Sequence, residues 1–105
     1  MKVLLVCSAG MSSALVAKAL EKEANKVGID MEVKECSTQA FEEEVKNGYI
    51  ISLVAPQIRH RYDTLKEYAT NQNVPCILIE PLSYTQLGGA RLLEQIKKEL
   101  GDNFK

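Results

Sequence analysis

A cysteine followed by small residues is the part of this sequence best suited to chemistry. The apolar stretch 3–6 ends at Cys7, and Ser8, Ala9, Gly10, Met11, Ser12 and Ser13 follow before a helical pattern begins. The apolar stretch predicts a buried strand, and Ser12 or Ser13 is a typical helix N-cap. Cys7 is therefore expected at the carboxyl end of a strand, next to the first turn of a helix.

This arrangement suits binding of a phosphate group. The backbone N–H groups of residues 8–13 can converge above the sulfur, and the serine hydroxyls add further donors. The positive end of the helix dipole favours a thiolate, which is a good nucleophile. Gly10 lets the backbone approach a ligand closely. We therefore predict that Cys7 is a nucleophile and that residues 8–13 bind phosphate, although a cysteine in an apolar strand is usually just a small buried side chain.

The loop lacks a basic residue, which narrows the reaction. Cysteine-dependent phosphatases have an arginine six positions after the nucleophile, where this chain has Ser13. Without that positive charge, hydrolysis of a phosphocysteine is poorly assisted, so the phosphoryl group can persist and be passed on. The loop thus favours a phosphoryl carrier. A hydrolase of the low-molecular-weight phosphatase kind and a non-catalytic regulatory module of the same fold remain alternatives.

Composition argues against several other classes of protein. A net charge of −1 over 105 residues gives no basic footprint for nucleic acid, and no apolar stretch approaches the ~20 residues of a membrane span. Lys2 precedes only a short apolar run without a cleavage pattern, so no signal peptide is expected. Three widely spaced cysteines and one histidine favour neither a disulfide framework nor a zinc site, so we expect no metal or cofactor. A working thiolate fits a reducing cytoplasm.

Strand and helix patterns alternate four times along the chain. Strands are expected at 3–7, 31–36, 49–55 and 76–79, and helices at 12–27, 57–71 and 85–100. Ser37 and Thr38 are candidate N-caps of a short helix that ends at Lys46. The alternation predicts one α/β domain over residues 1–105. It would be a three-layer, doubly wound domain whose four-stranded parallel sheet has the order 2-1-3-4 and helices on both faces. Leu15 and Val27 of the first helix and Leu87 of the last are expected to face the core.

The strand order places a candidate site at one edge of the sheet. Strands one and three are central in this order, and ligands bind at the carboxyl ends of strands where the order reverses. Cys7 follows the first strand, and Pro56 and Gln57 follow the third, so both segments should meet there. Gly88 and Gly89, near the start of the last helix, indicate close packing or a broken first turn.

These residues carry a resemblance that covers almost the whole chain. The segments VLLVCSAGMSSALV and APQIR, with Tyr84 and the glycines after the fourth strand, resemble the IIB subunit of the lactose/cellobiose/chitobiose class of the bacterial phosphoenolpyruvate-dependent sugar phosphotransferase system. The resemblance implies a cytoplasmic phosphotransferase that meets the membrane only transiently. Cys7 would accept a phosphoryl group from a phosphohistidine of a IIA partner. It would then pass the group to a sugar held by the membrane IIC subunit, such as cellobiose, chitobiose or lactose.

The same resemblance assigns roles around Cys7. Residues 8–13 would form the phosphate loop, Pro56 and Gln57 would border the site, and Tyr84 would lie at its rim. Cys36 and Cys76 are expected to be structural. His60, with Arg59 and Arg61, is either a solvated helix face or a basic patch that meets an anionic partner.

Overall fold

The computed structural model describes residues 1–7, 13–85 and 87–101. Its four strands form one parallel sheet in the order β2-β1-β3-β4, which confirms the predicted topology. The strands are β1 (Lys2–Cys7), β2 (Glu32–Ser37), β3 (Ile51–Val54) and β4 (Cys76–Leu78). In the two neighbouring pairs that share β1, Val3 lies opposite both Val33 and Ile51.

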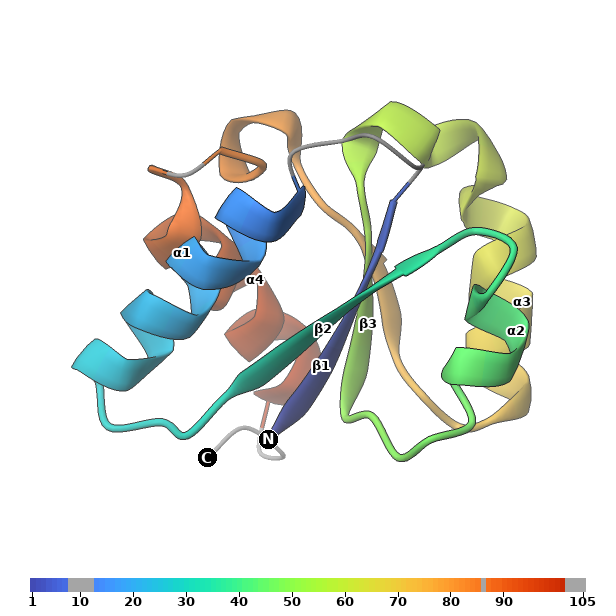
Figure 1. Ribbon diagram of the computed structural model, residues 1–105, viewed down its shortest axis with the longest axis horizontal. Helices are drawn as coiled ribbons and strands as arrows, with labels where there is room; N and C mark the ends of the chain where they lie inside the picture. Colours follow the sequence, from blue (N-terminus) through green and yellow to red (C-terminus); the bar gives the residue numbers. More distant parts are fainter. Residues whose placement is uncertain (8–12, 86, 102–105) are drawn as a thin grey trace.

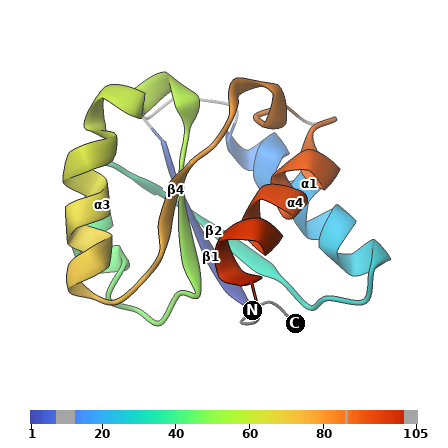
Figure 2. The same ribbon diagram turned by 180° about the vertical axis from the view of Figure 1, so that it is seen from behind.

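Helices cover both faces of this sheet, as the alternating pattern predicts. The helices α1 (Ser13–Lys26) and α4 (Gly89–Leu100) pack together on one face. The helices α2 (Phe41–Glu44) and α3 (Tyr62–Asn71) lie on the other, so the three layers are seen edge-on in Figure 1 and from behind in Figure 2. Strand β2 is at one edge of the sheet and β4 at the other.

The central strands form the core because helices cover them from both sides. All four residues of β3 are buried, and so are all residues of β1 after Lys2. Continuous apolar sequence is what a parallel strand needs when neither face meets water. Ser52 is the polar exception in β3, and its Oγ donates a hydrogen bond to the carbonyl of Pro75 at 3.0 Å. The edge strand β2 is more exposed.

The helix predicted over 57–71 is divided into two parts. The 3₁₀ segment η1 (Pro56–Arg61) comes first, and the α-helix begins only at Tyr62. Pro56 fixes its own backbone angle at the start of η1, and Ile58 has a non-helical conformation (φ −115°, ψ 28°) while its side chain is buried. Burial of Ile58 thus breaks the continuous helix that the spacing predicted.

The last helix also begins later than predicted, at Gly89 instead of residue 85. A second 3₁₀ segment, η2 (Pro81–Ser83), precedes it. A Cβ atom on Gly88 would lie 2.6 Å from the carbonyl oxygen of Ser83, and one on Gly89 would lie 2.6 Å from that of Ala19. The two glycines therefore serve close packing, which confirms one of the two readings of the pair.

Three of the predicted core residues are wrong, and so is the start of the short helix. Leu87 is 93% exposed because it precedes α4. Leu15 is 51% exposed in the first turn of α1, and Val27 is 62% exposed because it follows the end of α1. The short helix α2 begins at Phe41 since Ser37 is still part of β2. The Ser37 Oγ accepts a hydrogen bond from the Ala40 N–H at 3.3 Å.

Candidate functional site

Cys7 is the last residue of β1, at the carboxyl end of a central strand, as predicted. It pairs with Ser37 of β2, and its Sγ lies 4.0 Å from the carbonyl oxygen of Cys36. Helix α1 begins at Ser13 at the same end of the sheet (Figure 1). Ser8, Ala9, Gly10, Met11 and Ser12 of the predicted phosphate loop lie outside the described residues, and only the backbone of Ser13 is described. The nucleophile candidate thus lies six positions before the first described residue of α1, at the same end of the sheet.

The segment after β3 reaches the same edge beside Cys7. The N–H of Ala55 donates a hydrogen bond to the carbonyl oxygen of Val6 at 3.1 Å, which continues the pairing of β1 with β3. Pro56 follows and has no N–H to extend the pairing. Cys7 and the pair Pro56 and Gln57 are therefore brought together at the predicted reversal of strand order.

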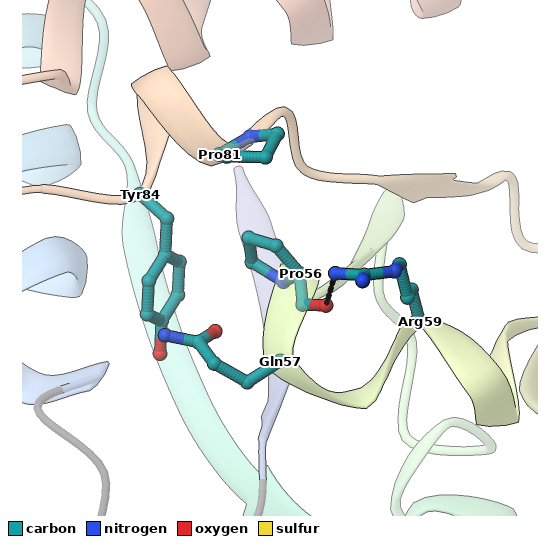
Figure 3. A pocket seen from close by; sticks show the side chains of 5 residues that line it. All are labelled: Pro56, Gln57, Arg59, Pro81 and Tyr84. Atoms are coloured by element: carbon teal, nitrogen blue, oxygen red, sulfur yellow. Dashed lines mark hydrogen bonds between the residues drawn. The ribbon is translucent and has the colours of Figure 1, made fainter.

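A pocket of about 230 Å³ opens beside this junction. It is lined by Pro56, Gln57, Arg59, Pro81 and Tyr84, which come from η1 and from the segment around η2. Figure 3 shows the Gln57 amide beside the Tyr84 ring and the Arg59 guanidinium reaching back over Pro56. Of the residues predicted to border the site, Pro56, Gln57 and Tyr84 all line this pocket, and Tyr84 is largely buried. Gln57 is exposed and gives the pocket a polar wall.

Two pocket residues, Arg59 and Pro81, were missed as site residues by the sequence argument. The Arg59 Nη1 donates a hydrogen bond to the carbonyl oxygen of Pro56 at 3.4 Å. Residues three apart lie on the same side of a 3₁₀ helix, so a 3₁₀ reading of 56–61 would have placed Arg59 over Pro56. Nothing in the hydrophobic spacing distinguishes such a turn from the start of an α-helix.

The other two cysteines have the properties of structural residues. Burial, with the nearby Glu44 carboxylate adding to it, raises the pKa of the Cys36 thiol to about 12. Burial also raises the pKa of the Cys76 thiol. Both raised pKa values favour the protonated thiol, which makes Cys36 and Cys76 poor thiolate nucleophiles.

Positive charge collects on η1. Arg59, His60 and Arg61 are consecutive and exposed. Among the residues that the structure describes, the ion pairs are Lys26–Glu23, Lys46–Glu43 and Lys97–Glu94, each between a lysine and a glutamate three positions earlier. None of these pairs includes the three basic side chains of η1.

Comparison with known proteins identifies the family. The family model for the lactose/cellobiose-specific IIB subunit of the phosphotransferase system matches residues 2–95. The chain belongs to this family. That match includes Cys7, Pro56, Gln57 and Tyr84 and confirms the resemblance drawn from the sequence. IIB components are phosphotransferases that work with IIA and IIC components in sugar transport.

Individual relatives agree with the family match. The oligo-beta-mannoside-specific EIIB component of Bacillus subtilis (strain 168) is 26% identical over 94 residues, which is 90% of each chain. The fold is also that of a lactose-specific IIB domain from Streptococcus pneumoniae, with a TM-score of 0.82 at 21% identity over 94% of this chain and 96% of that one. A cellobiose-specific IIB component from Borrelia burgdorferi has a TM-score of 0.74 at 26% identity, covering 98% and 94%.

None of the helices within the described ranges has the length and apolar character needed to cross a lipid bilayer.

Proposed function

We propose that Cys7 is the phosphoryl carrier of this IIB protein. It would take a phosphoryl group from a phosphohistidine of a IIA partner and give it to a sugar bound by the membrane IIC subunit. The observation that carries the proposal is the position of Cys7. It ends a central strand, adjoins the segment that starts with Pro56, and comes shortly before the N-terminus of α1. The family match over residues 2–95 supports the direction of transfer.

Transfer onto the protein is a displacement at phosphorus. The Cys7 thiolate attacks, the S–P bond forms, the P–N bond to the partner's imidazole breaks, and that nitrogen keeps the electron pair and takes a proton. The backbone N–H groups of residues 8–13 and the positive end of α1 would stabilise the charge on the phosphoryl oxygens. Pro56, Gln57 and Tyr84 would border the reacting group.

Transfer to the sugar reverses the role of the sulfur. A sugar hydroxyl attacks phosphorus, the O–P bond forms, and the S–P bond breaks to regenerate the thiolate. The proton of the hydroxyl must go to a group outside Cys7. The named relatives act on oligo-beta-mannosides, lactose and cellobiose. We therefore infer a β-linked disaccharide or short oligosaccharide as the sugar. We also propose that the IIB domain within residues 1–105 works in the cytoplasm, transiently at the inner face of the membrane.

The test is labelling by a IIA protein carrying radioactive phosphate on its histidine. We expect one phosphoryl group per chain in the wild type, none in Cys7→Ser, and full labelling in Cys36→Ser and Cys76→Ser, which are matched cysteine controls. Full-yield, stable labelling of Cys7→Ser would refute the assignment. Hydrolysis of an aryl phosphate that is lost in Cys7→Ser would instead identify a phosphatase. No labelling of the wild type by any IIA protein would identify a non-catalytic module.

A further inference from the structure

The outer side of strand β4 is covered by side chains. Strand β4 is at an edge of the sheet, so its outward backbone groups face no further strand within the described part of the chain. The Tyr62 hydroxyl of α3 donates a hydrogen bond to the carbonyl oxygen of Cys76 at 3.0 Å. The Gln95 Nε2 of α4 donates one to the carbonyl oxygen of Leu78 at 2.8 Å. One polar side chain from each helical layer thus satisfies a carbonyl group at this open edge.

Gln95 makes a second hydrogen bond, beyond the end of the strand. Its Oε1 accepts from the Glu80 N–H at 3.5 Å, so the amide spans Ile79, with its donor on the residue before and its acceptor on the residue after. A residue of a further parallel strand would make the same two bonds. The reversed amide would place like groups against each other, so the pair of bonds fixes its orientation. Gln95 therefore continues the ladder into the segment that leads to η2.

That segment carries two walls of the pocket. The carbonyl oxygen of Glu80 accepts a hydrogen bond from the Ser83 N–H at 2.8 Å, and the carbonyl oxygen of Pro81 accepts one from the Tyr84 N–H at 3.2 Å. Pro81 and Tyr84 line the pocket (Figure 3). A chain of hydrogen bonds thus runs from α4 through Glu80 to the pocket.

Helix α4 holds this segment at two points. The close backbone approach of Gly88 to Ser83 fixes its exit, and Gln95 holds its entry at Leu78 and Glu80. Gly88 and Gln95 are about two helical turns apart, so they lie on the same side of α4. The entry depends on one flexible side chain, whereas the exit depends on backbone contact.

We propose that Gln95 is a positioning residue for phosphoryl transfer. Its amide holds residues 79–84 where Pro81 and Tyr84 wall the pocket at the Cys7 edge of the sheet. Gln95 acts through this segment and not by contact with the phosphoryl group. The inference rests on the proposed function of Cys7 and adds to it a residue outside the site.

Gln95→Met tests the role because it keeps the side-chain length and the helix propensity but removes both hydrogen bonds. We expect hydrogen exchange at the Ser83 and Tyr84 N–H groups to become about fivefold faster, which is the equivalent of one hydrogen bond. Transfer from phosphorylated IIA to Cys7 should become about fivefold slower for the same reason.

Tyr62→Phe is the matched control. It removes one hydrogen bond from the same side of β4, at Cys76, which comes before the segment that leads to the pocket. We expect its unfolding midpoint to fall about as much as that of Gln95→Met, since each variant loses bonds to one edge. Exchange at Ser83 and Tyr84 and the transfer rate should both stay within about twofold of the wild type.

Two further variants separate the donor from the acceptor of the amide. Gln95→Lys keeps a donor for the Leu78 carbonyl, whereas the carboxylate of Gln95→Glu can only accept. Either charge enters a mixed environment, because the groove around Gln95 is lined by two acidic and two basic residues, Glu80, Glu94, Arg91 and Lys98. The donated bond is the shorter one, so we expect Gln95→Lys to transfer within about twofold of the wild type. Gln95→Glu should be at least as slow as Gln95→Met, and equal rates for the Lys and Glu variants would overturn the hydrogen-bonding role.

Failure of this inference is distinct from failure of the proposed function. If Cys7 is labelled but Gln95→Met transfers as fast as Tyr62→Phe, Gln95 has no positioning role and the carrier role stands. Unchanged exchange at Ser83 and Tyr84 in Gln95→Met leads to the same conclusion without any IIA protein. If the wild type is not labelled at all, the proposed function is wrong and this inference falls with it.

Discussion

The two edges of the parallel sheet satisfy their polar groups in different ways. At the amino edge, the Lys2 Nζ donates to the carbonyl oxygen of Asn47 at 2.9 Å and lies 4.5 Å from the centre of the Tyr49 ring. The Tyr49 hydroxyl donates to the Glu44 carboxylate at 2.5 Å, and the chain's amino group donates to the carbonyl of Asp30 at 3.0 Å. Charged groups at this edge are therefore used internally.

At the carboxyl edge, the Arg59 Nη1 donates to the carbonyl oxygen of Pro56 at 3.4 Å, but no ion pair among the described residues includes the basic side chains of η1. Arg59, His60 and Arg61 are exposed without an ion pair in residues 1–7, 13–85 and 87–101, and Leu82 of η2 is exposed as well. The segment around η2 at this edge is instead fixed by close backbone packing between Gly88 and Ser83. We therefore expect substitutions at the amino edge to change stability without changing phosphoryl transfer.

Gly88→Ala should give the largest effect, because it attacks the packing under the carboxyl edge. The added Cβ would lie 2.6 Å from the Ser83 carbonyl oxygen, which is backbone and cannot move aside alone. We expect a loss of about 1–3 kcal/mol in the free energy of unfolding, as for other overpacked sites. Because η2 must shift, phosphoryl transfer should fall at least about tenfold. Denaturant unfolding and the labelling assay measure the two effects.

Gly28→Ala is the control for that experiment. Gly28 has a φ of +79°, but an added Cβ would have nothing within 4 Å. Only the backbone conformation is disfavoured, which costs roughly 1 kcal/mol, and the transfer rate should not change. Equal loss of transfer in both variants would show that stability alone controls the carboxyl edge.

Lys2→Ala should have a smaller effect, and only at the amino edge. It removes the hydrogen bond to Asn47 and the contact with the Tyr49 ring. We expect about 1 kcal/mol lower stability in chemical unfolding, with an unchanged rate of labelling by phosphorylated IIA. Slower transfer at unchanged stability would contradict the division of roles between the two edges.

Tyr49→Phe should have the smallest effect, and its pH dependence sharpens the description of the amino edge. The hydrogen bond from Tyr49 lowers the pKa of the Glu44 carboxyl, while burial, together with that bond, raises the pKa of the Tyr49 hydroxyl. The interaction that lowers the pKa of Glu44 stabilises the fold at pH values above the usual carboxyl pKa. This stabilisation is lost as the pH falls through the pKa of Glu44 in the folded protein. The interactions that raise the pKa of Tyr49 stabilise the fold at pH values below the usual tyrosine pKa. This stabilisation is lost as the pH rises through the pKa of Tyr49 in the folded protein.

The difference in stability between wild type and Tyr49→Phe should therefore be greatest between about pH 5 and 9. It should stay below about 1 kcal/mol, because the Glu44 carboxylate is well solvated and solvent screens it. Unfolding midpoints measured across this pH range provide the check. A difference that grows below pH 4 would mean that the lowered carboxyl pKa has another source.

The strand order and the junction at the site could be predicted from the sequence. The nearly continuous apolar runs at 3–6 and 49–55 do not suit a strand that faces water, so they identified the two central strands. Cys7 and Pro56 directly follow those runs. Their meeting at one edge is then a matter of topology, which does not depend on side-chain detail.

The details at the ends of the helices could not be predicted in the same way. Leu87 continues the apolar spacing of α4 backwards, but the close approach of Gly88 to Ser83 starts the helix later and leaves Leu87 in solvent. Arg59 was assigned to a helix face because α and 3₁₀ turns share their first residues. Only the conformation at Ile58 distinguishes them, and that depends on what its side chain packs against.

The amino edge also offers places for covalent attachment. Strand β1 starts there and α4 ends there (Figures 1 and 2). Cys7 ends β1, and the residues that line the pocket follow β3 and β4, so both belong to the opposite edge. A fusion partner joined at either end must reach along a molecule whose largest extents are 32 and 29 Å before it can touch the cysteine. A linker of roughly ten extended residues covers that distance, and shorter ones would tether a donor without letting it react.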